Sequence, residues 1–376
     1  MSDIRYHIAP VENQKDSYQA YDILDFVVSF ENRKLNCNNI RFLADVEILD
    51  GSNHVAINKK TFIDALVGGH SFIGSLACQT MNQGSIENIQ HYPKVVSVLS
   101  RATMTEQDSF NSNRLCELRT PSEVVSNLLV KGTVQEPRTT YLKERNTDTD
   151  MSIVLMTCFN SAVNDSKLPY TLTGDIRYTV QLPSELGIMW GDSTIGTLIK
   201  YRLKNVRLSY QTFDDDGSRS KQYLFGVKGS IESTVQSSNS NFSTKYPMVC
   251  SSVVSTFTPQ SEDSNNAYNS LKCHQLPSVD RVEYLFNDSS NSVITYALDN
   301  PQDILQNFVD SLVLGPDAKS DLTLSNIANN QAWGLGVKFP QPIDLNSQKL
   351  SINIYSGVDN INPYTMYTVF FGLFTL

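Results

Sequence analysis

Short segments in which apolar and polar residues alternate dominate this sequence. In the clearest one, every second residue from Ile40 to Ile48 is apolar, and Arg41, Asp45 and Glu47 lie between them. A period of two is that of a β-strand with one buried face. The same alternation recurs in residues 176–182, 206–210 and 350–354, and polar turns separate such segments. The pattern predicts an all-β protein built of antiparallel sandwiches.

Only two segments predict helices. Residues 86–102 contain one, with its regular part after Pro93. The other is residues 300–314, where Asn300 is a favourable N-cap, Pro301 suits the first helical position and Asp303 lies near the positive end of the helix. One apolar face follows in the second helix, formed by Ile304, Leu305, Phe308 and Leu312.

The same order of predicted elements precedes both helices, which indicates an internal repeat. Residues 71–93 and 280–302 each predict a strand, a polar turn, a short strand and the start of a helix. Further on, residues 151–182 and 332–356 each lead from a strand through a proline-containing loop to another strand, at an offset of roughly 170–210 residues. The chain therefore predicts one sandwich plan used twice, in residues 21–195 and 196–376, after an N-terminal arm of residues 1–20.

The stretch from Ile231 to Ser270 differs from the rest of the second half. Half of its residues are Ser, Thr or Asn. Such a stretch buries little apolar area per residue, so we expect long exposed loops at one end of the second sandwich.

Composition limits the classes of partner and compartment. The net charge is −9 and no run of Lys or Arg occurs, which argues against direct coating of nucleic acid. The six cysteines are scattered without a CxxC pair, so we expect small buried thiols in a reducing compartment. The N-terminus lacks the apolar core of a signal peptide, and the longest apolar stretch, "YTVFFGLFTL", is too short to span a bilayer. We expect a soluble protein, cytosolic or nuclear when made.

Two kinds of candidate ligand cluster occur. Asp214, Asp215 and Asp216 before Gly217 could bind a hard cation or form a solvated hairpin turn, and the missing ligand spacing favours the turn. The same holds for Asp148 and Asp150. Cys273 beside His274 resembles half of a soft-metal site, but adjacent residues rarely point at one metal and no partner pair lies nearby.

Other motifs favour structural roles. Residues 334–339, "GLGVKF", lack the third glycine and the helix of a dinucleotide site, so the glycines are expected to let a strand pass close to a neighbour. Residues 70–76, "HSFIGSL", do not form a hydrolase elbow. In the aromatic tail, 364–371 predicts a core strand, while 374–376 fits a core strand and a clamp on a neighbouring molecule equally well. The sequence therefore predicts no catalytic, cofactor-binding or metal-binding residues.

The order of these motifs resembles that of double jelly-roll major capsid proteins, of the polinton-like virus and virophage type in the PRD1–adenovirus lineage. Residues 68–110 resemble the region where a strand pair leads into the helix of the first barrel. Residues 151–182, with Leu168 and Pro169 before the last strand, resemble its closing strands. Residues 198–213 resemble the opening strand of the second barrel, and residues 333–371 resemble its C-terminal strands. The resemblance covers most of residues 20–376.

The resemblance implies two tandem eight-stranded jelly rolls with short helices in loops. It implies a homotrimer that forms a pseudo-hexameric capsomer of an icosahedral DNA virus shell, with neighbouring capsomers, penton proteins and minor capsid proteins as partners. A shell with or without an internal membrane fits equally well. Two rival functions stay open: a virion spike or carbohydrate-binding sandwich, which would need clustered exposed aromatics, and a sandwich glycosidase, which would need a carboxylate pair in a groove.

Overall fold

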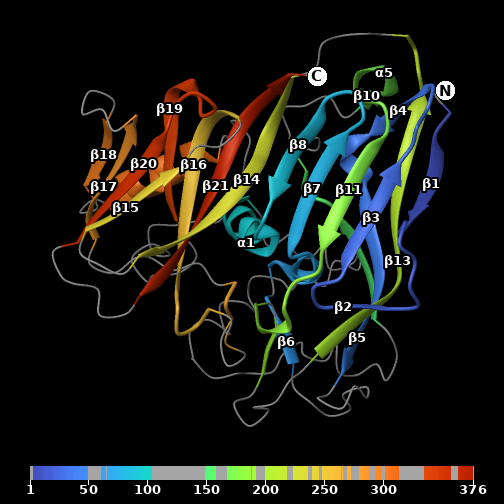
Figure 1. The fold of residues 1–376 in the computed structure, drawn as a ribbon, viewed down its shortest axis with the longest axis horizontal. Coiled ribbons are helices and arrows are strands. Elements are labelled where there is room, and N and C mark those ends of the chain that lie inside the picture. The colour runs from blue at the N-terminus through green and yellow to red at the C-terminus, as the bar shows by residue number, and fades with distance from the viewer. Residues whose placement is uncertain are drawn as a thin grey trace.

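The structure is a computed structural model, and it describes residues 3–49, 61–64, 66–103, 149–157, 167–187, 189–191, 200–217, 223–235, 239–244, 248–263, 265, 269–271, 279–287, 293–297, 301–312, 334–356 and 363–375. Strands account for most of the regular structure (Figure 1). Each helix is short, and no helix in these ranges is long and apolar enough to cross a membrane. The all-β class predicted from the alternation is therefore confirmed.

The first half of the chain forms two facing sheets. Its elements are β1 (Arg5–Pro10), β2 (Tyr18–Gln19), β3 (Ile23–Val28), β4 (Arg33–Asn36), β5 (Arg41–Leu49), β6 (Thr61–Ile63), β7 (Ser75–Thr80), β8 (Gly84–Ile89), α1 (Tyr92–Thr103), β9 (Thr149–Val154), β10 (Lys167–Pro169), α5 (Tyr170–Thr173), β11 (Ile176–Gln181), β12 (Met189–Gly191) and β13 (Lys200–Asp214). One sheet contains β1, β13, β5 and β9 in that order, and the other contains β3, β11, β7 and β8. Short 3-10 helices lie at 37–39, 68–72 and 185–187.

The second half repeats this arrangement. Its elements are β14 (Tyr223–Val235), β15 (Asn239–Thr244), β16 (Val249–Pro259), β17 (Val279–Phe286), β18 (Val293–Ala297), α6 (Pro301–Ser311), β19 (Leu335–Asp344), β20 (Leu350–Ser356) and β21 (Tyr364–Thr375). Its sheets run β14–β21–β16–β19 and β15–β20–β17–β18.

Identical strand orders show that both halves are jelly rolls. When the main strands of each half are counted along the chain, with β1 and β2 together as the first, one sheet has the order first, eighth, third, sixth. The other sheet has the order second, seventh, fourth, fifth in both halves. Two packed antiparallel sheets connected in this way define the eight-stranded jelly roll. The predicted double jelly roll is confirmed, and so is the repeated plan in which a strand pair precedes each helix.

The position of β13 differs from the expected division of the chain. We predicted that the second jelly roll begins at residue 196, which would make β13 its opening strand. Instead β13 pairs with β5 from Lys200 to Ser209 and with β1 from Arg207 to Thr212, so it is the eighth strand of the first roll. The expected N-terminal arm is also part of this sheet, because β1 and β2 both pair with β13. Alternation identified the strand correctly but carries no information about its partner.

The Ser-, Thr- and Asn-rich stretch was predicted as long loops, and this prediction is wrong. It contains the end of β14, all of β15 and all of β16. In β16, Cys250, Val253 and Val254 are fully buried, and the polar residues between them are buried or half-buried. Three of its hydroxyl groups, those of Ser252, Ser255 and Thr258, find partners inside the protein, and Ser255 shares a 3.0 Å hydrogen bond with Thr368 of β21. A hydroxyl that is hydrogen-bonded can be buried at little cost, so a Ser- and Thr-rich strand can lie in a core.

Apolar side chains from both sheets fill each sandwich. In the first roll, Phe26 of β3 and Phe42 of β5 meet edge to face, with ring centroids 6.1 Å apart. In the second roll, Phe286 of β17 and Phe339 of β19 do the same at 5.1 Å. Each pair joins the two sheets of its own sandwich, an arrangement that aromatic rings favour. Both rolls therefore contain a core of the kind expected for an independently folded unit.

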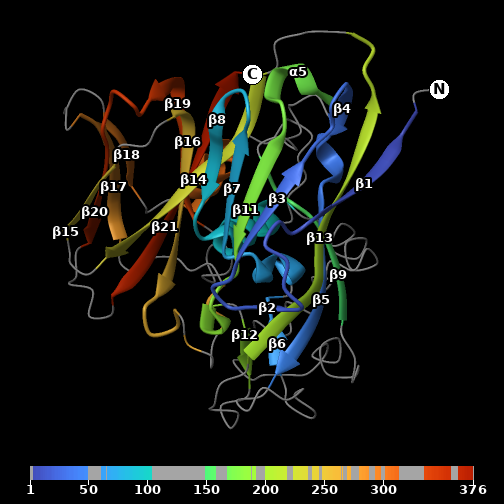
Figure 2. The same cartoon turned by 45° about the vertical axis from the view of Figure 1, so that its right-hand side comes forward.

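One sheet crosses from one roll to the other. Strand β8 of the first roll lies beside β14 of the second, where Asn88 and Gly229 pair in parallel. The result is a continuous sheet in the order β19–β16–β21–β14–β8–β7–β11–β3. Figures 1 and 2 show this sheet running through the middle of the molecule, with the remaining sheet of each roll near opposite ends.

Candidate functional site: the seam between the two jelly rolls

Helix α1 occupies the seam between the two rolls (Figure 1). It follows β8 after a short turn, and Pro93 lies in its first turn, where a missing backbone N–H costs nothing. The described side chains from Tyr92 to Ser100 are all buried, including those of Lys94, Ser97 and Ser100. A helix that is buried on all sides must be covered by more than the sheet that precedes it. Here the additional cover comes from the second roll.

Lys94 is the main polar link across the seam. Its side chain projects from α1 and is only 6% exposed. The ammonium group donates to Thr258 Oγ1 at 2.7 Å and to the backbone carbonyl of Ser270, and it lies 3.8 Å from Asp263 Oδ1. All three partners belong to the second roll. The charge is therefore paired and hydrogen-bonded, as a buried ammonium group requires.

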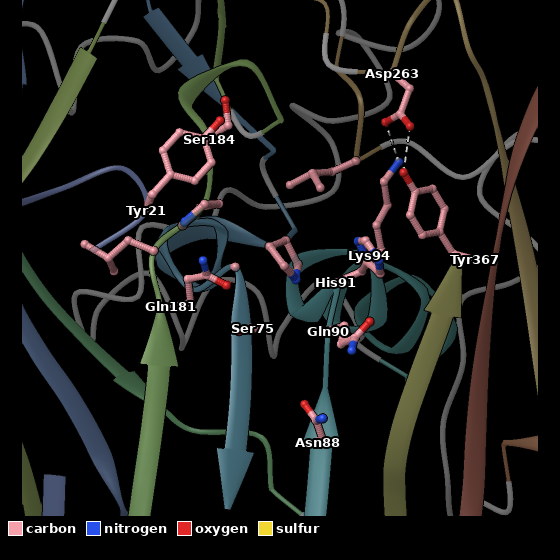
Figure 3. Close-up of a pocket in the computed structure, with 15 residues that line it drawn as sticks. Tyr21, Ser75, Asn88, Gln90, His91, Lys94, Gln181, Ser184, Asp263 and Tyr367 are labelled. Carbon is pink, nitrogen blue, oxygen red and sulfur yellow. Dashed lines mark hydrogen bonds and ion pairs between the residues drawn. The ribbon is translucent and has the colours of Figure 1, made fainter. Parts of the chain in front are cut away.

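Tyr367 completes this cluster from strand β21. Lys94 Nζ lies 4.6 Å from the centre of the tyrosine ring, within range of a cation–π interaction. The tyrosine hydroxyl donates to Asp263 Oδ2 at 2.6 Å, and His91 meets the ring edge to face. Figure 3 shows Lys94 pointing between Asp263 and Tyr367. The cluster fixes α1 of the first roll to two separate segments of the second.

Apolar packing continues across the same seam. Ser97 on α1 donates to the carbonyl oxygen of Leu271 at 2.5 Å, beside a shared hydrophobic cluster. This cluster contains the core of the first roll together with side chains of the second, namely Val254, Leu271, Phe308, Leu312, Val369 and Phe371. Two domains that share a large apolar interface move as one unit. The seam therefore holds the two jelly rolls in a fixed relative orientation.

The acidic run at the end of β13 is an ion-pair cluster. Asp214 lies 2.7 Å from Arg33, and the buried Lys34 lies 2.5 Å from Asp216 and 3.9 Å from Asp215. A hydrogen bond from the backbone N–H of Asp3, assisted by Arg33, lowers the pKa of Asp214. The carboxylates that we weighed as cation ligands or as a solvated turn are thus neutralised by basic side chains of β4.

Four of the other residues singled out from the sequence, Cys273, His274, Asp148 and Asn300, lie outside the described residues. Within the described ranges, no group of three or more His, Cys, Asp or Glu side chains is placed to hold a metal ion. Three cysteines are described, Cys37, Cys78 and Cys250, and all are buried thiols. Burial raises the pKa of Cys250 to about 12, which makes it unreactive.

The glycines of the "GLGVKF" segment have the structural role predicted for them. A Cβ atom at Gly336 would overlap Ser311 Oγ and lie 2.9 Å from Phe308 Cα, both on α6. A Cβ at Gly334 would lie 2.5 Å from the carbonyl oxygen of Ser255. Strand β19 can therefore approach α6 and β16 closely only because these side chains are missing.

An open cavity of about 560 Å³ lies beside the Lys94 cluster, at the end of the seam (Figure 3). Tyr21, Gln181 and Ser184 line it from the first roll, and Asp263 and Tyr367 from the second. Its lysine and its carboxylate, Lys94 and Asp263, are paired with each other. The described residues that line the cavity therefore present polar and aromatic groups but no carboxylate pair.

Sequence reasoning missed the Lys94 cluster. The available signal was a single lysine in an otherwise apolar helical stretch, "YPKVVSVLS". Such a lysine requires a buried partner. Nothing in the sequence could identify that partner, because Asp263 is far along the chain and lies in the segment predicted as exposed loops.

Comparisons with known proteins agree with this fold. The chain resembles the Faustovirus major capsid protein, with 8% sequence identity and a TM-score of 0.58 over 100% of this chain and 90% of that one. It resembles a chain of the PBCV-1 virus capsid, with 8% identity and a TM-score of 0.58 over 100% and 94%. It also resembles a chain of the Sputnik virophage structure, with 10% identity and a TM-score of 0.57 over 100% and 86%.

No family model matches the sequence, and no curated protein matches it. At such low identity the structural likeness shows the fold. The described part of the chain has the double jelly-roll fold of these capsid proteins.

Proposed function

We propose that this chain is a major capsid protein, which forms pseudo-hexameric homotrimeric capsomers in the shell of an icosahedral DNA virus. One observation carries the proposal: two jelly rolls with the same strand order are fixed side by side through a buried seam. Three such chains around a three-fold axis present six similar rolls, and a six-fold outline can tile a flat facet. The likeness to capsid proteins of PBCV-1, Faustovirus and Sputnik supports the same role.

The seam supports this role physically. A capsomer can tile a facet only if its six rolls hold their relative positions under contact with neighbours. Within one chain, the shared apolar cluster and the Lys94 cluster provide that rigidity. We place the two rolls at residues 3–214 and 223–375, with the junction between β13 and β14. The ion pairs from Arg33 and Lys34 to Asp214 and Asp216 anchor the chain just before this junction.

The expected partners follow from the capsomer. They are two further copies of the chain, neighbouring capsomers, and penton and minor capsid proteins. The net charge of −9 argues against direct sequence-specific contact with the genome. The protein would reside in the virion after assembly in the cytoplasm or nucleus of the infected cell. Its role would be structural rather than enzymatic.

Light scattering on the purified full chain tests this proposal. We expect a particle of three times 42.1 kDa, and negative-stain images with a hexagonal outline. A clean monomer at high protein concentration would contradict the proposal, and so would a particle with two-fold rather than three-fold symmetry.

A further inference from the structure

Strand β1 carries an exposed apolar stripe at the outer edge of the first roll. Ile4, Tyr6 and Ile8 are 48%, 74% and 65% exposed. Between them, His7 and Ala9 face inward: Ala9 is buried, and His7 stacks on Tyr210 with ring centroids 5.0 Å apart. The stripe is therefore formed by Tyr6 and Ile8 on the outer face of the strand, together with Ile4 just before the strand begins. On the neighbouring strand β13, its register partners are the polar residues Gln211 and Ser209.

The other edge of β1 is open within the described part of the chain. Its only strand partner there is β13, from Arg5–Thr212 to Pro10–Arg207. Figures 1 and 2 place β1 at the side of the molecule opposite β15, β17, β18 and β20. Proteins normally protect an edge strand with charged residues or proline. Strand β1 carries such residues only at its two ends, where Arg5 and Pro10 are exposed, and the exposed residues between them are the large apolar Tyr6 and Ile8. Strand β19, at one edge of the continuous sheet, instead has exposed Pro340 and Pro342 within it.

The stripe is held firmly in place. The N–H of Asp3 donates to Asp214 Oδ2 at 2.9 Å, and Arg33 Nη2 donates to the Asp3 carbonyl at 2.7 Å. His7 Nε2 hydrogen-bonds Thr212 Oγ1 at 2.9 Å. An ordered strand that exposes three large apolar side chains to water is the signature of a binding surface.

We infer that β1 is a contact between copies of this chain, covered by the second jelly roll of the next copy in the trimer. This inference rests on the proposed function and names the surface that it uses. A ring of three copies requires two different contact surfaces on each chain, one at each end. The stripe lies at the first-roll end, so the matching surface belongs to the second-roll end of the next copy.

Local charge favours a protein partner over a nucleic acid or an anionic membrane. Next to the stripe, Asp3 pairs with Arg5 and Asp214 pairs with Arg33, so the surroundings are neutral although the chain carries −9. A nucleic acid or an anionic lipid surface would be met by excess basic residues. Two copies of an acidic chain repel each other, and a neutral zone is where they can meet.

The size of the stripe fits the centre of a larger interface. Covering the three side chains would bury on the order of 300 Å² of apolar surface, since an enclosed aromatic side chain alone buries about 150–250 Å². A stable interface needs about 800 Å² on each partner. The stripe therefore supplies an apolar core, and the adjoining wall of the roll must supply the rest, as a second copy of a two-roll molecule would allow.

The test compares two variants of the full chain by light scattering over a dilution series. Tyr6→Ser/Ile8→Ser removes most of the stripe, and Met81→Ser is the matched control, because Met81 is 77% exposed but lies in the β7–β8 turn. We expect the trimer of the stripe variant to dissociate at a protein concentration at least about tenfold higher than that at which the wild-type trimer dissociates. The reason is that buried tyrosines contribute a large share of the binding free energy of an interface. Met81→Ser should match the wild type, and all three proteins should have the same circular dichroism.

Hydrogen exchange on the wild-type protein provides a measurement that no variant can confound. Amides of residues 4–8 should exchange more slowly in the trimer than in the diluted monomer. The inference is overturned if the stripe variant forms a trimer as stable as that of the wild type. It is also overturned if the β1 amides of the wild type exchange equally fast in the trimer and in the monomer. Either result leaves the capsomer proposal standing. The inference also fails, and the capsomer proposal again stands, if β1 becomes protected only when trimers assemble further, or when vesicles or another protein are added. A wild-type monomer overturns both.

Discussion

Replacing Lys94 by methionine tests whether the seam holds the two rolls together. Methionine fills a similar volume but removes the charge and all the donors of the ammonium group. The carboxylate of Asp263, whose side chain is 18% exposed, would then keep its hydrogen bond from the Tyr367 hydroxyl but lose the ion pair with Lys94. Removing one member of a buried pair costs about 3–5 kcal/mol, and the partial exposure of Asp263 places the expected loss at about 3 kcal/mol. This loss would fall on the contact between the rolls rather than on either core.

The assay must therefore report on each roll separately. Urea unfolding can be followed by hydrogen exchange in two buried strands, β11 in the first roll and β20 in the second. In the wild-type protein, we expect both strands to lose protection at one urea concentration. In Lys94→Met, the free energy of unfolding should fall by about 3 kcal/mol and the two midpoints should separate, because the rolls no longer stabilise each other.

Two further variants make this prediction sharp. Lys167→Met is the control, because Lys167 Nζ lies 4.8 Å from the centre of the Phe213 ring in a similar cation–π contact. Lys167 is exposed, and both residues belong to the first roll. This substitution should lower the free energy of unfolding by less than about 1 kcal/mol. Lys94→Met/Asp263→Asn should be more stable than Lys94→Met alone, because no unpaired charge is left in the seam. If Lys94→Met unfolds within about 0.5 kcal/mol of the wild type and with coincident midpoints, the Lys94 cluster does not hold the seam.

Three other predictions concern single residues. Gly336→Ala should destabilise the protein by about 2 kcal/mol in thermal unfolding, because the new Cβ would overlap Ser311 on α6, and an unchanged stability would contradict the close approach of α6 to β19. Burial, with repulsion from Arg33 and Arg5, lowers the pKa of His7 below 6.5 in the folded protein. The free energy of unfolding should therefore fall as the pH drops from 6.5 towards that lowered value, because the unfolded chain binds the proton more readily. His7→Phe should flatten this part of the stability–pH curve. Cys250 should resist alkylation at neutral pH in the folded protein and react after unfolding, as peptide mass spectrometry can show.

Local patterns in the sequence predicted the repeated elements of this fold. The alternation from Ile40 to Ile48 predicted β5, and the two proline-initiated helical segments predicted α1 and α6. The strand pairs before both helices fell where the repeat predicted them. These features depend on residues close together in the chain, which is why periodicity and capping identify them.

Features that depend on distant residues could not be obtained in this way. The alternation of β13 is the same whether it closes the first roll or opens the second, so its assignment depended on pairing with β5 and β1. The polar composition of β16 indicated loops, because the partners that satisfy its hydroxyls lie far away in the chain. Lys94 posed the same difficulty, since its partner Asp263 is identified only when the two rolls are packed together.

The same sandwich plan serves different purposes in its two copies. In the first roll, the helix after the fifth strand, α1, enters the seam and carries Lys94 to the second roll. In the second roll, the corresponding helix α6 packs against β16 and β19 of its own roll, where Gly336 makes room for it, and it adds only the apolar side chains Phe308 and Leu312 to the shared cluster. At the outer edges, the first roll presents the exposed apolar side chains Tyr6 and Ile8 on strand β1, and the second presents exposed Pro340 and Pro342 on strand β19. A head-to-tail ring can close only if the two ends of each chain differ, because identical ends would pair about a two-fold axis instead. In the proposed capsomer, the differences between the two rolls would therefore supply the two unlike ends that a three-fold ring requires.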